Sequence, residues 1–242
     1  MESDIVHSDL LYRAWAWFEK NRKQVIMGTV AAILIGLIIY FIVWQREEKR
    51  AEASRALSAA FASEADKPQT NVNAEAYLEV ARKHPNTQAA RLATLMGAST
   101  LFEQGKYEPA LAEYQKFSRE NPGSPFAAQA LVGAGASQEA LGKKEQAIEA
   151  YSSAVERYPN SPVLAQAKFS LARLLEEKGT LERAFLLYQD VSRDGFGSLA
   201  GEARSRVDEL KEKHPEIAAK VKPVTPVLSP ATNTAPKPAV SK

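Results

Sequence analysis

The chain has 242 residues, and 31 lysines and arginines stand against 29 aspartates and glutamates, so its formal net charge is only +2. This balance lacks the basic excess of a dedicated nucleic-acid-binding protein, and we expect no nucleic-acid partner. Hydrophobic residues make up 45% of the sequence, which excludes wholesale disorder. The absence of cysteine excludes disulfides, thiolate nucleophiles and cysteine-ligated metals.

The N-terminal segment, residues 1–24, carries apolar residues at helical spacing: Leu10, Leu11, Ala14, Trp15, Trp17 and Phe18. Four basic residues are interspersed with them. An amphipathic helix of this composition can lie in the headgroup layer of a membrane. It can equally continue the following apolar run into an aromatic belt at the interface, and the sequence leaves both interpretations open.

Residues 25–44 form an uncharged run, VIMGTVAAILIGLIIYFIVW. As a helix this run would span about 30 Å, the thickness of the hydrocarbon core of a bilayer. It is longer than the roughly 7–15 apolar residues of a signal peptide, and the charged sequence QREEKR follows it. We therefore predict a single transmembrane helix over 25–44. Basic residues are equally numerous before and soon after it, so charge alone does not orient the span.

Small residues recur every four positions within this run, at Gly28, Ala32 and Gly36. They share one face of the predicted helix, and such faces let two transmembrane helices approach closely. We interpret them as a helix-packing face, which includes the possibility of a homodimer through the span. Small residues are also common in membrane helices that have no specific partner.

After the span, helix-favouring residues predominate and no alternation typical of strands occurs. Four residue types recur at an interval of 37: Tyr77, Tyr114, Tyr151 and Tyr188; Pro85, Pro122 and Pro159; Gly105, Gly142 and Gly179; Ala110, Ala147 and Ala184. A fixed interval shared by several residue types predicts an all-α solenoid of about four repeats.

Each repeat is predicted to consist of a helix, a glycine turn, a second helix and a proline turn. The next first helix is expected to start at a hydroxyl cap followed by proline, as in Ser124-Pro125 and Ser161-Pro162, with Thr87 in the equivalent place. The recurring alanines suit a close crossing of the paired helices, and the tyrosines are expected to face the core.

These stretches resemble the tetratricopeptide repeat family. The resemblance rests on LMGASTLFEQGKYEPALAEYQKFSRENP, VGAGASQEALGKKEQAIEAYSSAVERYP and SLARLLEEKGTLERAFLLYQDVSRDG. A degenerate first repeat is expected to use Arg46 to Ser63 and Glu75 to Lys83 as its helices. A charged helix from Leu199 to Lys213 is expected to cap the solenoid, which then covers residues 45–213.

The whole layout, a short N-terminal segment, one span and repeats that follow a linker helix, resembles the membrane-anchored ancillary subunit family of the bacterial Sec translocon. This resemblance implies a protein of the bacterial inner membrane with a cytoplasmic N-terminus and periplasmic repeats. It implies a scaffold whose partners are translocon subunits, a periplasmic chaperone or unfolded secretory chains. The alternative is a structural subunit of another envelope assembly, for outer-membrane protein insertion, cell division or polysaccharide export.

Residues 214–242 contain six prolines, no aromatic residue and a single acidic residue, Glu216. Such a segment cannot bury enough apolar surface to fold alone, so we predict a disordered Pro-rich tail. Its proline-containing pieces favour extended conformations, which could also serve as a spacer or a docking strand.

No arrangement typical of catalysis is found in the sequence. The histidines His7, His84 and His214 lack metal-ligand spacing. The adjacent pairs Glu47-Glu48 and Glu176-Glu177 would point about 100° apart on a helix, unlike the facing carboxylates of a hydrolase. We predict a non-enzymatic protein without metal or cofactor.

The binding surface of such a solenoid is the groove lined by the first helix of each repeat. The resemblance carries this groove to Leu95, Ser99 and Phe102, to Val132, Ala136 and Glu139, and to Phe169, Arg173 and Glu176. Its apolar members could receive an apolar or amphipathic segment, with Arg173 as a polar anchor. The alternative is that these residues pack between repeats or against the linker helix.

Overall fold

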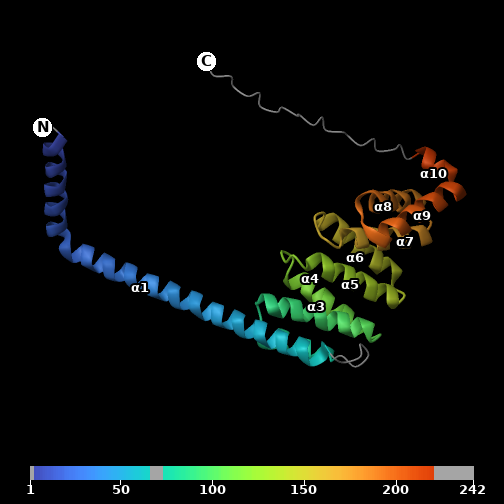
Figure 1. Cartoon of the computed structure of the whole chain (residues 1–242), viewed down its shortest axis with the longest axis horizontal. Helices are drawn as coiled ribbons and strands as arrows, with labels where there is room; N and C mark the ends of the chain where they lie inside the picture. The colour runs from blue at the N-terminus through green and yellow to red at the C-terminus, as the bar shows by residue number, and fades with distance from the viewer. Residues whose placement is uncertain (1–2, 66–72, 221–242) are drawn as a thin grey trace, which may run out of the picture. The chain divides into compact units, whose positions relative to one another are not determined.

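The computed structural model describes residues 3–65 and 73–220, and within these ranges the chain forms ten α-helices and no strand (Figure 1). The all-α prediction is therefore confirmed. The helices are α1 (Ser3–Ala65), α2 (Ala74–Lys83), α3 (Gln88–Glu103), α4 (Tyr107–Glu120), α5 (Ala127–Ala140), α6 (Lys144–Arg157), α7 (Leu164–Glu177), α8 (Leu181–Asp194), α9 (Gly197–Lys213) and α10 (Pro215–Lys220). By its contacts the chain divides into two compact units, 1–120 and 121–242.

In the first unit, one long helix carries both the apolar run and the start of the solenoid. The side chains from Ile26 to Trp44 are exposed along α1, and this helix is long and apolar enough to cross a membrane. Its C-terminal turns pack against α2 and α3, where Ala53 is fully buried. The degenerate first repeat therefore pairs the end of α1 with α2. The domain boundaries expected after residues 24 and 44 fall inside one continuous helix.

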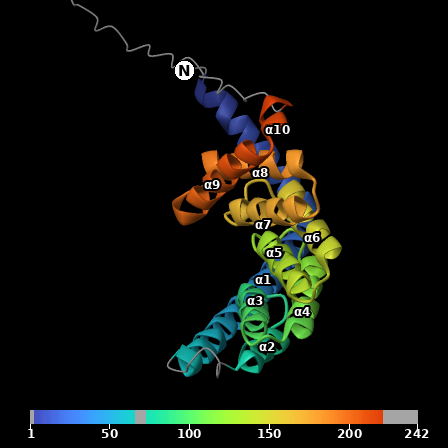
Figure 2. The same ribbon diagram turned by 90° about the vertical axis from the view of Figure 1, so that its right-hand side faces the viewer.

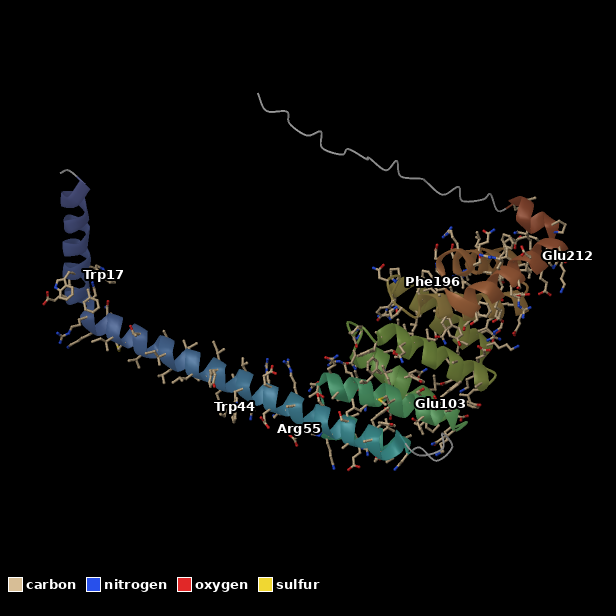
Figure 3. All side chains as sticks on the ribbon, in the orientation of Figure 1. Trp17, Trp44, Arg55, Glu103, Phe196 and Glu212 are labelled. Carbon is tan, nitrogen blue, oxygen red and sulfur yellow. The ribbon has the colours of Figure 1, made fainter. Side chains whose placement is uncertain are left out.

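The N-terminal part of α1 bends away from the remainder of the helix (Figure 1). Trp17 lies close to the bend and Trp44 lies farther along the helix (Figure 3). The side-chain amide of Asn21 donates a hydrogen bond of 2.9 Å to the carbonyl of Trp17. Such a bond competes with the backbone ladder at this point. Both interpretations of residues 1–24 remain predictions.

In the second unit, consecutive helices from α5 to α9 pack on one another, and α10 contacts α8 and α9 (Figure 2). The core is built from aromatic and aliphatic side chains such as Phe185, Tyr188 and Leu171. The recurring alanines, Ala110 in the first unit and Ala147 and Ala184 in the second, are fully buried. This burial agrees with the close helix packing predicted for them.

The turns between paired helices repeat the same backbone geometry. Gly105, Gly142 and Gly179 have φ of +73°, +73° and +79°, the left-handed region that favours glycine. In each turn the glycine N–H bonds a carbonyl three residues back at 2.9 Å, and the next N–H bonds a carbonyl five residues back at 2.8–2.9 Å. This is the Schellman arrangement that satisfies the last carbonyls of a helix, and it confirms the predicted glycine turns.

The predicted helix starts are only partly right. Thr87 caps α3 and accepts a hydrogen bond from the N–H of Ala90 at 3.0 Å. The hydroxyls of Ser124 and Ser161 instead accept from the N–H two residues later, at 3.2 and 3.4 Å. Each Ser-Pro pair forms a separate turn, because its Ser carbonyl accepts from the N–H of Ala127 or Leu164 at 3.0 Å. The helices α5 and α7 begin after these turns, and the prediction of a serine cap followed by proline was wrong.

The end of the solenoid agrees with a capping helix but extends beyond it. Helix α9 begins at Gly197, two residues before the expected Leu199. The six residues of α10 belong to the stretch expected to form the tail, and Ile217 is buried in the core of the second unit. Burial of the Ile217 side chain therefore attaches α10 to the folded unit. The remainder of the predicted tail, 221–242, lies outside the described residues.

Candidate functional site

The residues predicted to line a groove lie on α3 in the first unit and on α5 and α7 in the second. Their apolar members are mostly inside: Leu95, Val132 and Phe169 are only 2%, 6% and 9% exposed. This placement agrees with the alternative that these three pack between helices. The other six predicted residues are half-buried, namely Ser99, Phe102, Ala136, Glu139, Arg173 and Glu176. The accessible part of the predicted surface is therefore more polar than the sequence indicates.

In the second unit the accessible residues belong to a network of charged side chains. Arg173 on α7 forms ion pairs with Glu139 on α5 and, at 3.3 Å, with Glu177 one helical turn away. Lys144 on α6 pairs with the other carboxylate oxygen of Glu177 at 2.7 Å. The network joins three helices, and its guanidinium is shared between two carboxylates. A partner carboxylate could bind Arg173 only by exchanging with one of them.

Electrostatics keep these groups charged at neutral pH. Burial on its own would lower the pKa of Arg173, but the hydrogen bond and charge of Glu139 outweigh it and raise that pKa. The hydrogen bond from Lys144 lowers the pKa of Glu177 against a smaller opposing effect of burial. The surface therefore presents paired charges of both signs.

Two tyrosines from the second helices of the repeats donate hydrogen bonds to two of these glutamates. The Tyr151 hydroxyl donates to Glu139 at 3.4 Å, and the Tyr188 hydroxyl donates to Glu176 at 2.9 Å. Burial raises the pKa of both phenols, and the neighbouring glutamates raise it further. Both tyrosines are thus neutral donors, and both carboxylates are held in fixed positions.

Tyr151 and Tyr188 lie in the core, as the 37-residue interval predicts, but their hydroxyls also have a polar role that the interval does not predict. The signal was present, because the spacing from Glu139 to Tyr151 equals the spacing from Glu176 to Tyr188. In the first unit Phe102 stands where the other repeats have glutamate. Its ring lies 5.3 Å from the ring of Tyr107. The first unit therefore offers an aromatic contact at the position where the second unit offers a carboxylate.

The predicted packing face of the span is open in the structure. Gly28, Ala32 and Gly36 lie on the exposed part of α1, and a Cβ added at either glycine would contact nothing within 4 Å. A second transmembrane helix could therefore approach this face closely. Its role in packing remains a prediction.

Comparison with known proteins identifies two overlapping family matches. Residues 15–122 match a tetratricopeptide repeat-like domain, and residues 95–162 match a tetratricopeptide repeat. No curated protein sequence matches the chain.

Among solved structures, the chain is similar to one described as the crystal structure of MamA protein, at 19% identity and a TM-score of 0.48. That similarity covers 72% of this chain and 92% of the other. It is also similar to BtubC from P. vanneervenii, at 17% identity and a TM-score of 0.46, over 81% of this chain and 96% of the other.

Proposed function

The chain is a tetratricopeptide repeat protein, and from this premise we propose that it is a membrane-tethered scaffold that holds partner proteins at a membrane surface. Repeats of this kind bind other proteins, which supports a protein-protein interaction role in general. The more specific part of the proposal concerns the location of the repeats and the identity of the proteins that they bind.

The observation that carries the tethering proposal is the continuity of α1. Trp44 ends the apolar run, and Ala53 is already fully buried in the first repeat. Ala53 lies nine positions after Trp44 along the helix, a rise of about 14 Å. No loop interrupts the helix over this distance. If residues 25–44 cross a membrane, the first repeat is held close to the headgroup layer by a stiff connection.

We place the repeats on the outer side of a bacterial cytoplasmic membrane, with translocon subunits, a periplasmic chaperone or unfolded secretory chains as partners. The layout of the sequence, which resembles the ancillary Sec subunits, supports this choice. Phe102 in the first unit and the network around Arg173 in the second offer one aromatic and one charged contact surface. Apolar segments suit the first of these surfaces, and polar or charged segments suit the second.

The topology is tested with single cysteines, because the native chain has none. Gly123→Cys lies at an exposed turn where a Cβ meets no neighbour, and Ser8→Cys lies ahead of the span. A membrane-impermeant maleimide applied to bacterial spheroplasts should label Gly123→Cys and leave Ser8→Cys unlabelled until lysis. The reverse pattern would put the repeats in the cytoplasm and contradict the proposed partners.

Partners are tested by photo-crosslinking from the proposed surface. A crosslinking residue at Phe102 should capture translocon subunits, a chaperone or nascent secretory chains. The matched control is Lys116, an exposed position on α4. Identical capture from both positions would show that the surface around Phe102 is not selective and would reject it as the binding surface.

A further inference from the structure

A pocket of about 560 Å³ opens in the second unit, between the start of α7, the end of α8 and the start of α9. Apolar side chains form much of its lining, including Val163, Val191 and Leu199. Phe196 stands at its edge and is 93% exposed, an unusual state for a large apolar side chain.

The 37-residue interval explains why this pocket is unfilled. One repeat earlier, Tyr158 bridges two adjacent turns, and its hydroxyl donates to the carbonyl of Pro122 at 2.8 Å. The equivalent position 37 residues later is Gly195, which has no side chain. A Cβ there would collide with the carbonyl oxygen of Val191, so this backbone does not admit a larger residue. This repeat therefore has no side chain equivalent to that of Tyr158 to fill the pocket.

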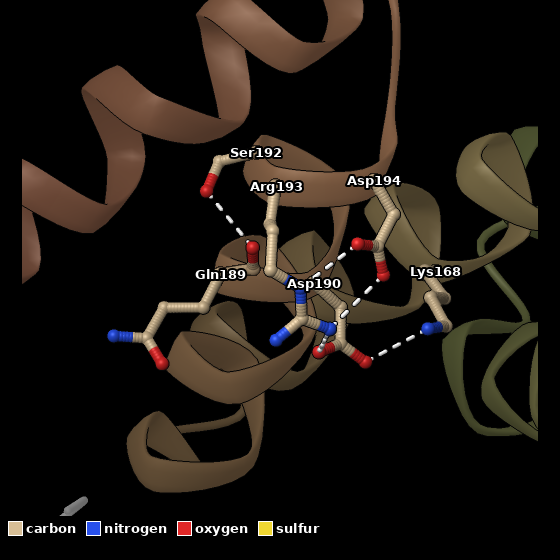
Figure 4. Close-up of polar contacts among 6 residues, drawn as sticks. All are labelled: Lys168, Gln189, Asp190, Ser192, Arg193 and Asp194. Carbon is tan, nitrogen blue, oxygen red and sulfur yellow. Dashed lines mark hydrogen bonds and ion pairs between the residues drawn. The ribbon is translucent and has the colours of Figure 1, made fainter. Parts of the chain in front are cut away.

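Charged side chains belong to one side of the pocket lining, and Figure 4 shows the ion pairs that they form. Lys168 and Asp190 pair at 2.7 Å, and Arg193 contacts Asp190 at 3.1 Å and Asp194 at 2.8 Å. Lys168, Asp190 and Asp194 belong to the lining, which thus carries two acids and one base. Because Lys168 and Arg193 already pair with both carboxylates, this side of the pocket carries no net charge, and the pocket calls chiefly for an occupant with an apolar strip.

We propose that residues 223–230 of this same chain, PVTPVLSP, dock in the pocket. Prolines favour the extended polyproline conformation, which loses little entropy on binding and packs well against exposed aromatic rings such as Phe196. The segment supplies Val227 and Leu228 for the apolar lining. Residues 221–242 contain no acidic residue, so the segment brings no charge that would repel the carboxylates of Asp190 and Asp194.

The chain length fits this docking. Helix α10 ends at Lys220, whose ammonium lies 3.6 Å from Glu182 in the first turn of α8. Asp194, at the far end of α8, is twelve residues further, a rise of about 18 Å. A polyproline chain at about 3.1 Å per residue covers that distance in about six residues. Six residues beyond Lys220 is Pro226, which brings Val227 and Leu228 to the pocket.

The test uses disulfide formation in the full-length protein in detergent. Ser229→Cys is combined with Gln166→Cys, an exposed residue of the pocket lining. In the control pair it is combined with Ser205→Cys, which is exposed midway along α9 and does not belong to the pocket lining. Docking predicts that the pocket pair oxidises at least ten times faster than the control pair. An undocked tail would oxidise the two pairs at similar rates, and that result would overturn the proposal.

Two further variants separate docking from chance proximity. Phe196→Ala removes an exposed side chain, and Leu228→Asp places a charge in the docking segment. Each should slow the pocket pair to the rate of the control pair without changing the melting temperature. A pocket pair that is insensitive to both changes would contradict the proposal. Disulfide-linked dimers in place of an internal bond would identify a second copy as the occupant and would also overturn it.

Discussion

Gln138 occupies a core position that its neighbouring repeats fill with leucine. The equivalent residues 37 positions away, Leu101 and Leu175, are buried, and Gln138 is only 7% exposed. Its side-chain carbonyl oxygen is buried and has no hydrogen-bond partner within the part of the chain that the structure describes. An unsatisfied buried polar atom costs about 1–3 kcal/mol, so this residue lowers the stability of the second unit.

Gln138→Leu is therefore expected to raise the free energy of unfolding by about 1 kcal/mol, because it removes the unsatisfied amide and keeps a similar volume. Urea denaturation followed by circular dichroism measures the change. Gln129→Leu, at an exposed position of the same helix, is the control and should change stability by less than about 0.5 kcal/mol. A loss of stability in Gln138→Leu would mean that the amide is hydrogen-bonded in solution.

At the same scale, the sequence located the candidate surface residues but not their burial. The 37-residue interval correctly assigned Leu95, Val132 and Phe169 to the first helix of each pair. It could not say which of them point inward, because these helices contact neighbours on more than one side and α3 and α5 carry apolar residues around most of their circumference. The bonds from Tyr151 and Tyr188 to glutamates depend on helix crossings, which periodicity does not specify.

At the scale of elements, the turns separate what local sequence specifies from what it does not. A glycine at the end of a helix has few alternatives to the left-handed conformation, so the three glycine turns could be predicted. A Ser-Pro pair before the next helix can form either of two structures, a helix cap or a separate turn. The structure uses the turn at Ser124 and Ser161, and the helices begin three residues later. The choice between a cap and a separate turn depends on how the connection joins the two helices in space. A single sequence does not specify this geometry.

The close crossing at Ala147 gives a prediction for the pairing of helices. Ala147→Leu is expected to destabilise the second unit by about 1–3 kcal/mol, because the added carbons have no free volume at a fully buried crossing. Thermal melting compares it with Ala140→Leu, an exposed position at the end of α5. Equal melting temperatures for the two variants would show that the helix pair accommodates the added carbons and would contradict this prediction.

For the molecule as a whole, the amino-acid composition changes along α1, but the backbone remains one continuous helix. Residues 1–24, 25–44 and the start of the solenoid differ in composition, and this difference suggested separate segments. The structure joins them in α1, because nothing between Trp44 and Ala53 breaks a helix: the intervening residues are charged or polar helix formers and alanine. Composition thus predicted the membrane-compatible run, but it could not predict the stiffness of its connection to the repeats.

That stiffness leads to a prediction about helical phase. Two alanines inserted between Glu48 and Lys49 rotate the first repeat by about 200° around the axis of α1, whereas seven alanines rotate it by only about 20° in the opposite sense and move it farther away by about 10 Å. If partners are met at the membrane surface, capture from Phe102 should fall at least several-fold with two alanines. With seven alanines it should largely be retained.

Unchanged thermal melting of both insertion variants would confirm that the repeats still fold. A Gly-Ser-Gly-Ser insertion at the same place serves as a flexible control, because it removes the fixed phase and should give intermediate capture. Equal capture by all three variants would mean that orientation around α1 is irrelevant. The long helix would then act only as an anchor, and the repeats would select their partners without help from the membrane.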